Sequence, residues 1–211
     1  MFIFFLKLFD NIILLQFIMK RIILTLVVLF YSFQGVLFGQ EKEMYNLFLK
    51  YSEYYHSGNF RKAEEVLLQV VNPQYNPNRF YFSDAYNNLG VVNLTLGNYD
   101  KALEYNLKAE AYISKSDPIS QNLADIYNNR GRIYNIKKSF DLSIEYLEKS
   151  IRIYQNLGAH NKLTLDHLSL ANINISIAFI ETKNYLKALR YLEKNVKLNL
   201  SVIWGYSEIS M

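Results

Sequence analysis

The sequence predicts an all-α protein, an α-solenoid of about four helix-turn-helix repeats behind an N-terminal apolar helix. The main observation is a short sequence motif that occurs four times: a turn residue, then an aromatic, then a small residue three positions later. Spacings of 39, 41 and 45 residues separate the four aromatics, which are Phe60, Tyr99, Phe140 and Tyr185. Such a unit is long enough for two helices and too short for a domain, so a repeat array is expected.

Amphipathic stretches lie on both sides of each aromatic and define two helices per unit, helix A before the turn and helix B after it. Asp117 and Pro118 suit the start of a helix, whereas Pro73 and Pro77 mark a long loop. We therefore expect helices at about 42–57, 60–71, 81–96, 99–114, 118–136, 140–157, 161–182 and 185–199.

Small residues show how the two helices of one unit are expected to pack. Helix A carries Gly90 in the second unit and Gly131 in the third, where it would meet its own helix B. Helix B carries Ala102 and Ser143 on the facing side. Large side chains between them fill the grooves, so that the ridges of the helices interlock. Because one hairpin cannot bury both of its faces, the hairpins are expected to stack.

The fourth unit differs because its helix A is apolar on several sides. The apolar residues concerned are Ile173, Ile175, Ile177, Phe179 and Ile180. A helix that is apolar all round is normally buried, so another part of the molecule must cover it. The tail at 201–211 is too short for another hairpin. Either it folds back as the cover, or the chain is a fragment whose later repeats lie elsewhere.

The order of residue types in the second unit resembles the tetratricopeptide repeat. An aromatic, Leu-Gly, a turn glycine, an aromatic and two alanines follow one another as Tyr86, Leu89, Gly90, Gly97, Tyr99, Ala102 and Ala109. The third unit matches with Arg130 in place of the leucine and Lys138 in place of the turn glycine. The first unit is degenerate, with Lys50 and Tyr51 where Leu-Gly is expected, and so is the fourth, which has Asn172 in place of an aromatic.

The resemblance covers residues 42–200 and implies a right-handed superhelix. Its repeats lie at about 42–75, 82–115, 119–157 and 161–199. The period exceeds the ordinary repeat length of about 34 residues. It is similar to the extended variety found in kinesin light chains and in the exported input regions of bacterial sensor histidine kinases and regulators.

The N-terminus is expected to carry a signal peptide or membrane anchor at residues 19–39. Met19 is followed by Lys20 and Arg21, then by an uncharged, mostly apolar run, and Gly39 precedes a polar chain. This order is typical of a bacterial secretory signal. A membrane-anchoring helix is the alternative, because about 20 apolar residues span a bilayer. Residues 1–18 resemble an over-extended N-terminus, with Met19 as the true start. Either interpretation places the repeats in the periplasm.

Composition gives no support to an enzyme. The chain has no cysteine, which excludes thiol catalysis and thiolate metal sites. His56, His160 and His167 have no metal-ligand spacing, and no phosphate-binding or nucleophile motif is present. The net charge is +4 and no basic stripe is interleaved with aromatics, so nucleic acid is not an expected partner. We expect no catalytic activity, no cofactor and no metal.

Asparagine recurs where helices do not favour it. Asn88, Asn129 and Asn174 occupy one equivalent position of successive A helices, and Asn87 and Asn128 precede two of them. In the arrays that this chain resembles, the position points into a concave groove. There an amide, which is both donor and acceptor, can pair with the backbone of an extended peptide.

Neighbouring residues on the same face are expected to supply specificity: Asp84, Val91, Asp125, Arg132 and Asn135. The alternative is that the asparagine amides only bridge adjacent repeats or face solvent, which satisfies the same hydrogen-bonding requirement. The candidate peptide-binding residues are therefore Asn87, Asn88, Asn128, Asn129, Asn174, Arg132 and Asn135.

The sequence thus predicts a noncatalytic scaffold that is exported or membrane-anchored and binds a protein or peptide partner in its groove. A second hypothesis is the periplasmic input portion of a truncated sensor histidine kinase or transcription regulator, whose output domain is absent from this chain. A third is an accessory subunit of a glycosyltransferase or peptidase whose catalytic half lies elsewhere.

Overall fold

The computed structural model describes residues 19, 21–26, 29–30, 39, 42–72, 79–113, 119–158 and 162–204. The chain divides into two compact units, Met1–Asn46 and Leu47–Met211, which we describe separately. The described residues of the first unit are helical and mostly exposed. Residues 1–18 and most of the predicted signal at 19–39 lie outside the described residues, as does the end of the tail from 205 onward.

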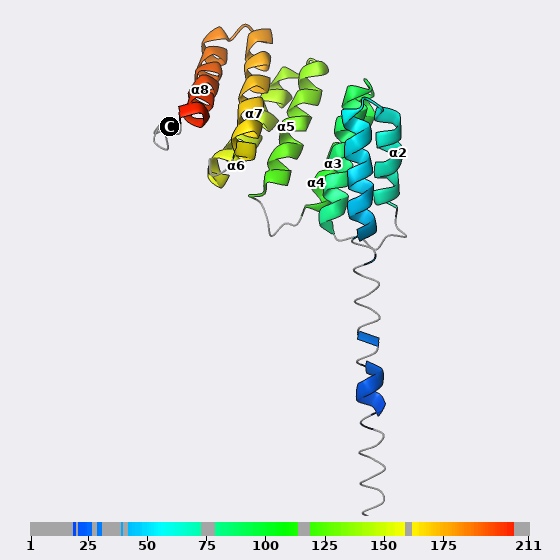
Figure 1. Cartoon of the computed structure of the whole chain (residues 1–211). Coiled ribbons are helices and arrows are strands. Elements are labelled where there is room, and N and C mark those ends of the chain that lie inside the picture. The colour runs from blue at the N-terminus through cyan, green and yellow to red at the C-terminus, as the bar shows by residue number, and fades with distance from the viewer. Residues whose placement is uncertain are drawn as a thin grey trace, which may run out of the picture. The chain divides into compact units, whose positions relative to one another are not determined.

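The second unit consists of antiparallel helical hairpins, and the part of it that is described contains no strand (Figure 1). The first helix covers residues 42–56, so it begins in the first unit and ends in the second. The others are α2 (Phe60–Val70), α3 (Arg79–Thr95), α4 (Tyr99–Tyr112), α5 (Gln121–Ile136), α6 (Phe140–Leu157), α7 (Lys162–Glu181) and α8 (Tyr185–Trp204). Helices α3 and α4, α5 and α6, and α7 and α8 pack as pairs. The predicted solenoid of helical hairpins is confirmed.

Two helix ends differ from the sequence-based expectation. Helix α5 begins at Gln121 because the Ser120 side chain accepts a hydrogen bond from the backbone N–H of Leu123. A start at 118 was expected from Asp117 and Pro118, which lie outside the described residues. Helix α8 continues to Trp204, beyond the expected end at 199.

Each hairpin turn contains one residue in the left-handed region. Gly58 and Gly97 have φ of 76° and 80°, and Lys138 and Lys183 have φ of 56° and 60° at the equivalent positions. The next residue in each turn donates its backbone N–H to the carbonyl five residues earlier, as Asn98 does to Asn93 at 2.8 Å. This is the hydrogen bond of a Schellman cap. The cap geometry is therefore kept even where lysine replaces the glycine that best tolerates it.

The small residues predicted at the contact between helices A and B are buried there. Ala102 and Ser143 have no exposed surface, and the Ser143 hydroxyl donates to the Gly131 carbonyl at 2.8 Å. A Cβ atom on Gly131 would lie 2.4 Å from Cγ of Leu147. The hairpin of α5 and α6 can close to this distance only because position 131 carries no side chain.

Adjacent hairpins stack through two positions of a B helix and one of the following A helix. The three positions are occupied by Leu67, Val71 and Leu89 at the first junction, and by Leu147, Ile151 and Ile175 at the third. At the second junction they are polar, with Asn106, Glu110 and Arg130. These three positions are therefore apolar at two junctions and polar at the one between them, where Ile133 still packs against Leu94 and Ala102.

Arg130 is the centre of this polar junction and is only 2% exposed. Its Nη2 lies 2.6 Å from Glu110 Oε2, and its Nε donates to Asn106 Oδ1 at 2.8 Å. The guanidinium carbon lies 4.7 Å from the centre of the Tyr146 ring. The charge is therefore paired, hydrogen-bonded and placed over an aromatic face, which are the conditions under which a buried arginine is tolerated.

Helix α7 confirms the apolar character expected of the fourth unit. It is the one helix among the described residues that is long and apolar enough to span a membrane, and half of the segment concerned is buried. The core helix of a globular protein can be equally long and apolar, and α7 is packed against both α6 and α8. A row of aliphatic side chains on it still remains 38–44% exposed: Leu170, Ile173, Ile177 and Ile180.

Candidate functional site

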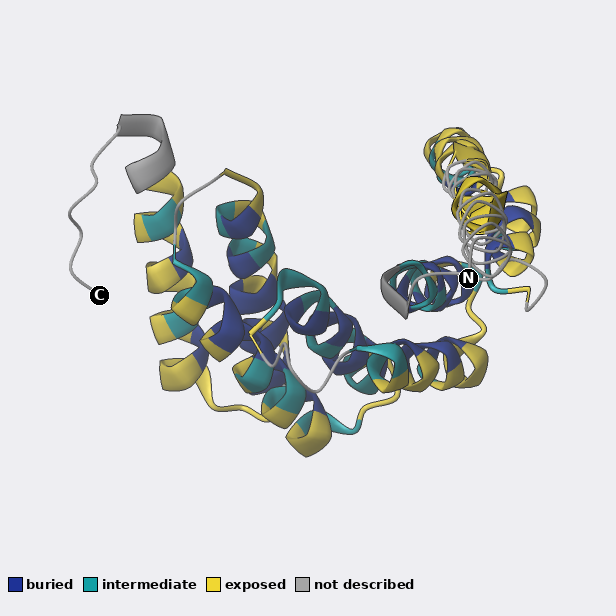
Figure 2. Cartoon of the chain, turned by 90° about the horizontal axis from the view of Figure 1, so that it is seen from below, coloured by how far each residue is buried: buried dark blue, intermediate teal, exposed yellow. Residues whose placement is uncertain are grey.

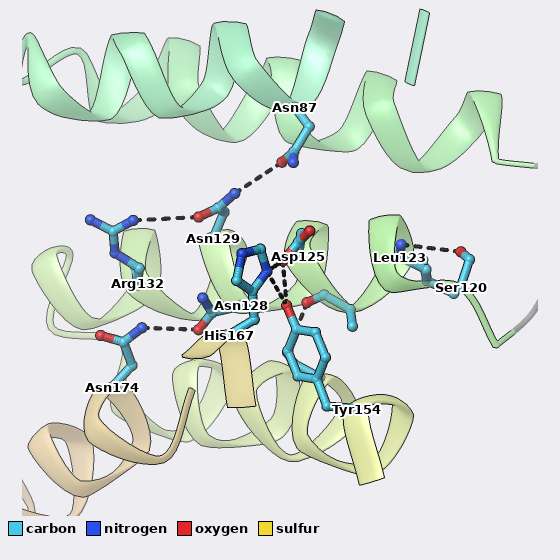
Figure 3. Close-up of polar contacts among 12 residues, drawn as sticks. Asn87, Ser120, Leu123, Asp125, Asn128, Asn129, Arg132, Tyr154, His167 and Asn174 are labelled. Atoms are coloured by element: carbon cyan, nitrogen blue, oxygen red, sulfur yellow. Dashed lines mark hydrogen bonds and ion pairs between the residues drawn. The ribbon is translucent and has the colours of Figure 1, made fainter. Parts of the chain in front are cut away.

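The predicted asparagines form two equivalent pairs between successive A helices (Figure 3). Asn129 Nδ2 donates to Asn87 Oδ1 at 3.0 Å, joining α5 to α3. Asn174 Nδ2 donates to Asn128 Oδ1 at 2.9 Å, joining α7 to α5. All four side chains are buried. The recurrence of asparagine is thus explained in part by a hydrogen bond that repeats from one hairpin to the next.

Asn88 occupies the same helical position as Asn129 and Asn174 but lacks an equivalent neighbour. The preceding repeat places Phe48 where the later repeats place Asn87 and Asn128. Among the described residues, no hydrogen bond of the Asn88 side chain is found, and the residue is half-buried. Of the three asparagines at this position, Asn88 is therefore the one whose amide is available to a ligand.

Arg132 and Asn135 extend the asparagine pairs along α5. Arg132 Nη1 lies 3.4 Å from Asn129 Oδ1, and Asn135 Nδ2 donates to the Asn174 carbonyl at 2.9 Å. The other end of the Asn135 amide, Oδ1, is buried and has no hydrogen-bond partner within the described part of the chain. The structure thus brings six of the seven predicted residues into two groups of three, and peptide binding by them stays a prediction.

A second polar cluster, formed by side chains of α5, α6 and α7, was not predicted from the sequence. The Tyr154 hydroxyl donates to Asp125 Oδ1, and His167 Nδ1 lies 2.5 Å from the same oxygen (Figure 3). His167 was expected to be an exposed or packed histidine without a metal, and no group of three metal-ligand side chains occurs among the described residues. Tyr154 and His167 come from α6 and α7, so only the stacking of the third and fourth hairpins assembles the cluster.

Two side chains of this face, Asp84 and His167, have raised pKa values. Burial, and then the charge of Asp125, raise the pKa of Asp84 to about 6. The hydrogen bond to Asp125 raises the pKa of His167 above its ordinary value. Both groups therefore hold their protons more firmly in the folded chain than in the unfolded one, so both lose their contribution to stability as pH rises.

We expect Asp84→Asn to stabilise the folded chain at pH 8 and to change little at pH 4. The unfolded carboxyl titrates near pH ~3.9, so between about pH 4 and 6 the folded state increasingly carries an unfavourable charge that asparagine lacks. Allowing for partial exposure, the gain at pH 8 is on the order of 1 kcal/mol. Urea unfolding of both proteins at the two pH values measures it. Equal gains at both values would contradict a titration of Asp84.

The fold and the repeated turn define the chain first as an α-solenoid built from helical hairpins. The sequence profile described as "Tetratricopeptide repeat" matches residues 83–111 and 124–157, which are the second and third hairpins. None of the curated protein sequences matches the chain. The second and third hairpins therefore match the tetratricopeptide repeat.

Two solved structures have a similar fold. The crystal structure of BtubC (BKLC) from P. vanneervenii has a TM-score of 0.65 and 21% identity, and the match covers 76% of this chain and 64% of that one. A structure of pilF from Pseudomonas aeruginosa has a TM-score of 0.59 and 22% identity, over 77% of this chain and 64% of that one. The chain thus spans less than two thirds of either neighbour, and at these identities the likeness concerns the fold alone.

Proposed function

We propose that the chain is a noncatalytic binding scaffold that is exported or membrane-anchored and holds an extended segment of a partner protein on its A-helix face. Tetratricopeptide repeats generally serve protein interaction, and that coarser role follows from the family. The single observation that carries the finer proposal is the side-chain amide of Asn88, which makes no hydrogen bond within the described part of the chain and is only half-buried. Asn88 supplies the polar group, and the α7 row (Leu170, Ile173, Ile177 and Ile180) supplies an apolar surface further along the A helices.

The chemistry of this face indicates the kind of segment that fits it. An extended backbone has unpaired N–H and C=O groups, which an asparagine amide can satisfy irrespective of side-chain sequence. Apolar side chains of the segment would cover the α7 row, which would otherwise remain in contact with water. Arg132, half-buried beside these residues, favours a carboxylate at one position of the segment.

We expect Asn88→Ala to weaken peptide binding about 5- to 10-fold, which corresponds to the loss of one hydrogen bond of about 1–1.5 kcal/mol. The probe is a peptide selected from a phage-displayed library against the full chain, and titration calorimetry measures its affinity. The melting temperature should stay unchanged, since the Asn88 amide supports no other helix.

Asn129→Ala is the matched control for this experiment. It removes the bond to Asn87, so it is expected to destabilise the fold by about 0.5–1.5 kcal/mol. Unchanged affinity in Asn88→Ala, or selected peptides that protect only the B helices from hydrogen exchange, would refute binding on the A-helix face.

Export has its own test. When the chain is expressed in a Gram-negative bacterium, we expect the product to begin near Gln40 and to be released with the periplasmic fraction, because the segment before it combines the three parts of a secretory signal. Intact-mass analysis measures the new terminus. A product that keeps Met19 and sediments with membranes would favour an anchor, and one that stays in the cytoplasm would refute export.

A further inference from the structure

Helix α8 carries a continuous apolar stripe that the rest of the described chain leaves uncovered. The stripe consists of Tyr185, Leu189, Leu192 and Val196, spaced four, three and four residues apart. Leu189 and Val196 are 53% and 58% exposed. In Figure 2 the helix that precedes the C-terminus is exposed along its outer side. Spacing of this kind places apolar side chains along one line of a helix and is typical of a seam between two helices.

Equivalent positions on the preceding B helix show what the stripe is suited to contact. Leu192 and Val196 correspond to Leu147 and Ile151 of α6, which are 0% and 5% exposed. Those two side chains belong to the core cluster that α6 forms with Leu168, Ala171 and Ile175 of α7. The surface by which α6 packs against the next helix therefore recurs on α8, where no described residue covers it.

The first repeat does not offer a matching surface at the other end of the array. Its A helix places Lys50 and Glu53, both exposed, where α3 places the fully buried Leu89 and Val92. Stacking α8 of one molecule on the first helix of another would thus set apolar side chains against charges that have no partner in that contact. Head-to-tail association is disfavoured for this reason.

The edge of the α8 stripe carries charges of both signs. Glu193 lies beside the stripe, and Arg190 and Lys197 lie one turn before and after it on the same flank. When two identical helices pair about a two-fold axis, the same edge of each meets the other, so an edge that carries both signs is complementary to itself. Another α8 stripe therefore matches this one in both polarity and charge.

We propose that α8 pairs with α8 of a second copy of the chain, forming a two-fold symmetric dimer through the stripe of Tyr185, Leu189, Leu192 and Val196. In each copy, the pairing buries the surface of α8 that is equivalent to the surface of α6 buried against α7. It leaves the A-helix face free, so it does not depend on the binding function proposed above.

The chain contains no cysteine, so a single introduced thiol reports its own contacts. We expect Leu189→Cys, near the middle of the stripe where a two-fold axis brings the two copies together, to give a disulfide-linked species of twice the chain mass when cells that express the full chain are oxidised and analysed on a non-reducing gel. Leu107→Cys is the control, because Leu107 is a 50% exposed leucine on α4, away from the stripe. It should remain a single chain under the same conditions.

Sedimentation velocity of the purified full chain provides the second measurement. The wild type is expected to sediment as a dimer, and Leu189→Glu with Val196→Glu as a monomer with an unchanged helical circular-dichroism spectrum. Leu107→Glu should remain a dimer. A monomeric wild type without cross-linking at position 189, a dimer that survives both glutamates, or binding of the stripe to anionic lipid vesicles in place of self-association would each overturn the proposal.

Discussion

Gly131→Ala is expected to destabilise the array by about 1–3 kcal/mol, although alanine favours a helix more than glycine does. The added Cβ would lie 2.4 Å from Cγ of Leu147, a side chain with no exposed surface and therefore no room to turn away. Overpacking of this kind forces helices apart or side chains out of their rotamers. Urea unfolding followed by circular dichroism measures the loss.

Two variants test this explanation. Gly90 occupies the equivalent position of α3. A Cβ added there would lie 3.2 Å from the Ala102 carbonyl oxygen, which is nearer to an ordinary van der Waals distance, so Gly90→Ala should cost less than Gly131→Ala. Gly131→Ala combined with Leu147→Ala should recover part of the stability that Leu147→Ala alone loses, because each change supplies the space or volume that the other needs. Additive losses would show that α5 and α6 do not meet at this point.

Arg130→Ala is expected to cost about 3 kcal/mol or more. The substitution removes the charged partner of Glu110, which keeps only its hydrogen bond from the Tyr127 hydroxyl, and it leaves the buried Asn106 Oδ1 without its hydrogen-bond donor. The cost lies at the lower end for a buried pair because Glu110 remains about one-third exposed and can be hydrated. Lys137→Ala is the control, since it breaks an exposed ion pair with Asp100 of α4 and should cost less than about 0.5 kcal/mol.

The third junction suggests how the loss can be recovered. It places Leu147, Ile151 and Ile175 at the positions of Asn106, Glu110 and Arg130. Transferring these three residues to the second junction should restore or exceed wild-type stability, because an apolar triad of similar volume needs no desolvated charge. If Arg130→Ala alone has no effect on the unfolding midpoint, the arginine does not hold the second and third hairpins together.

Much of the fold was predictable because each hairpin is specified locally. The turn motif located every described hairpin. The small residues Ala102, Ser143 and Gly131 were assigned correctly to the contact between helices A and B. These features depend on helical period and on turn chemistry, which are encoded within a few residues. Lys138 shows the limit of residue type alone, since it adopts the left-handed conformation that the pattern reserves for glycine.

The candidate site was less predictable because its contacts cross from one hairpin to the next. Equal spacing revealed that asparagine recurs at positions 88, 129 and 174. It did not reveal that Asn129 would reach Asn87 of the preceding hairpin, since that depends on the rotation between hairpins. The contact of Asp125 with His167 joins residues that are 42 positions apart and lies beyond any local pattern.

The polar junction at Arg130 has a consequence for how the array comes apart. In a linear array, each hairpin interacts only with its neighbours, so stability is a sum of hairpin and junction terms. Buried charges contribute less net free energy than well-packed side chains, so we expect the second junction to couple its hairpins less strongly than the apolar third junction does. The segments 60–112 and 121–204 should therefore behave as two separate foldons, whose amide protons exchange at different rates and with different sensitivity to salt.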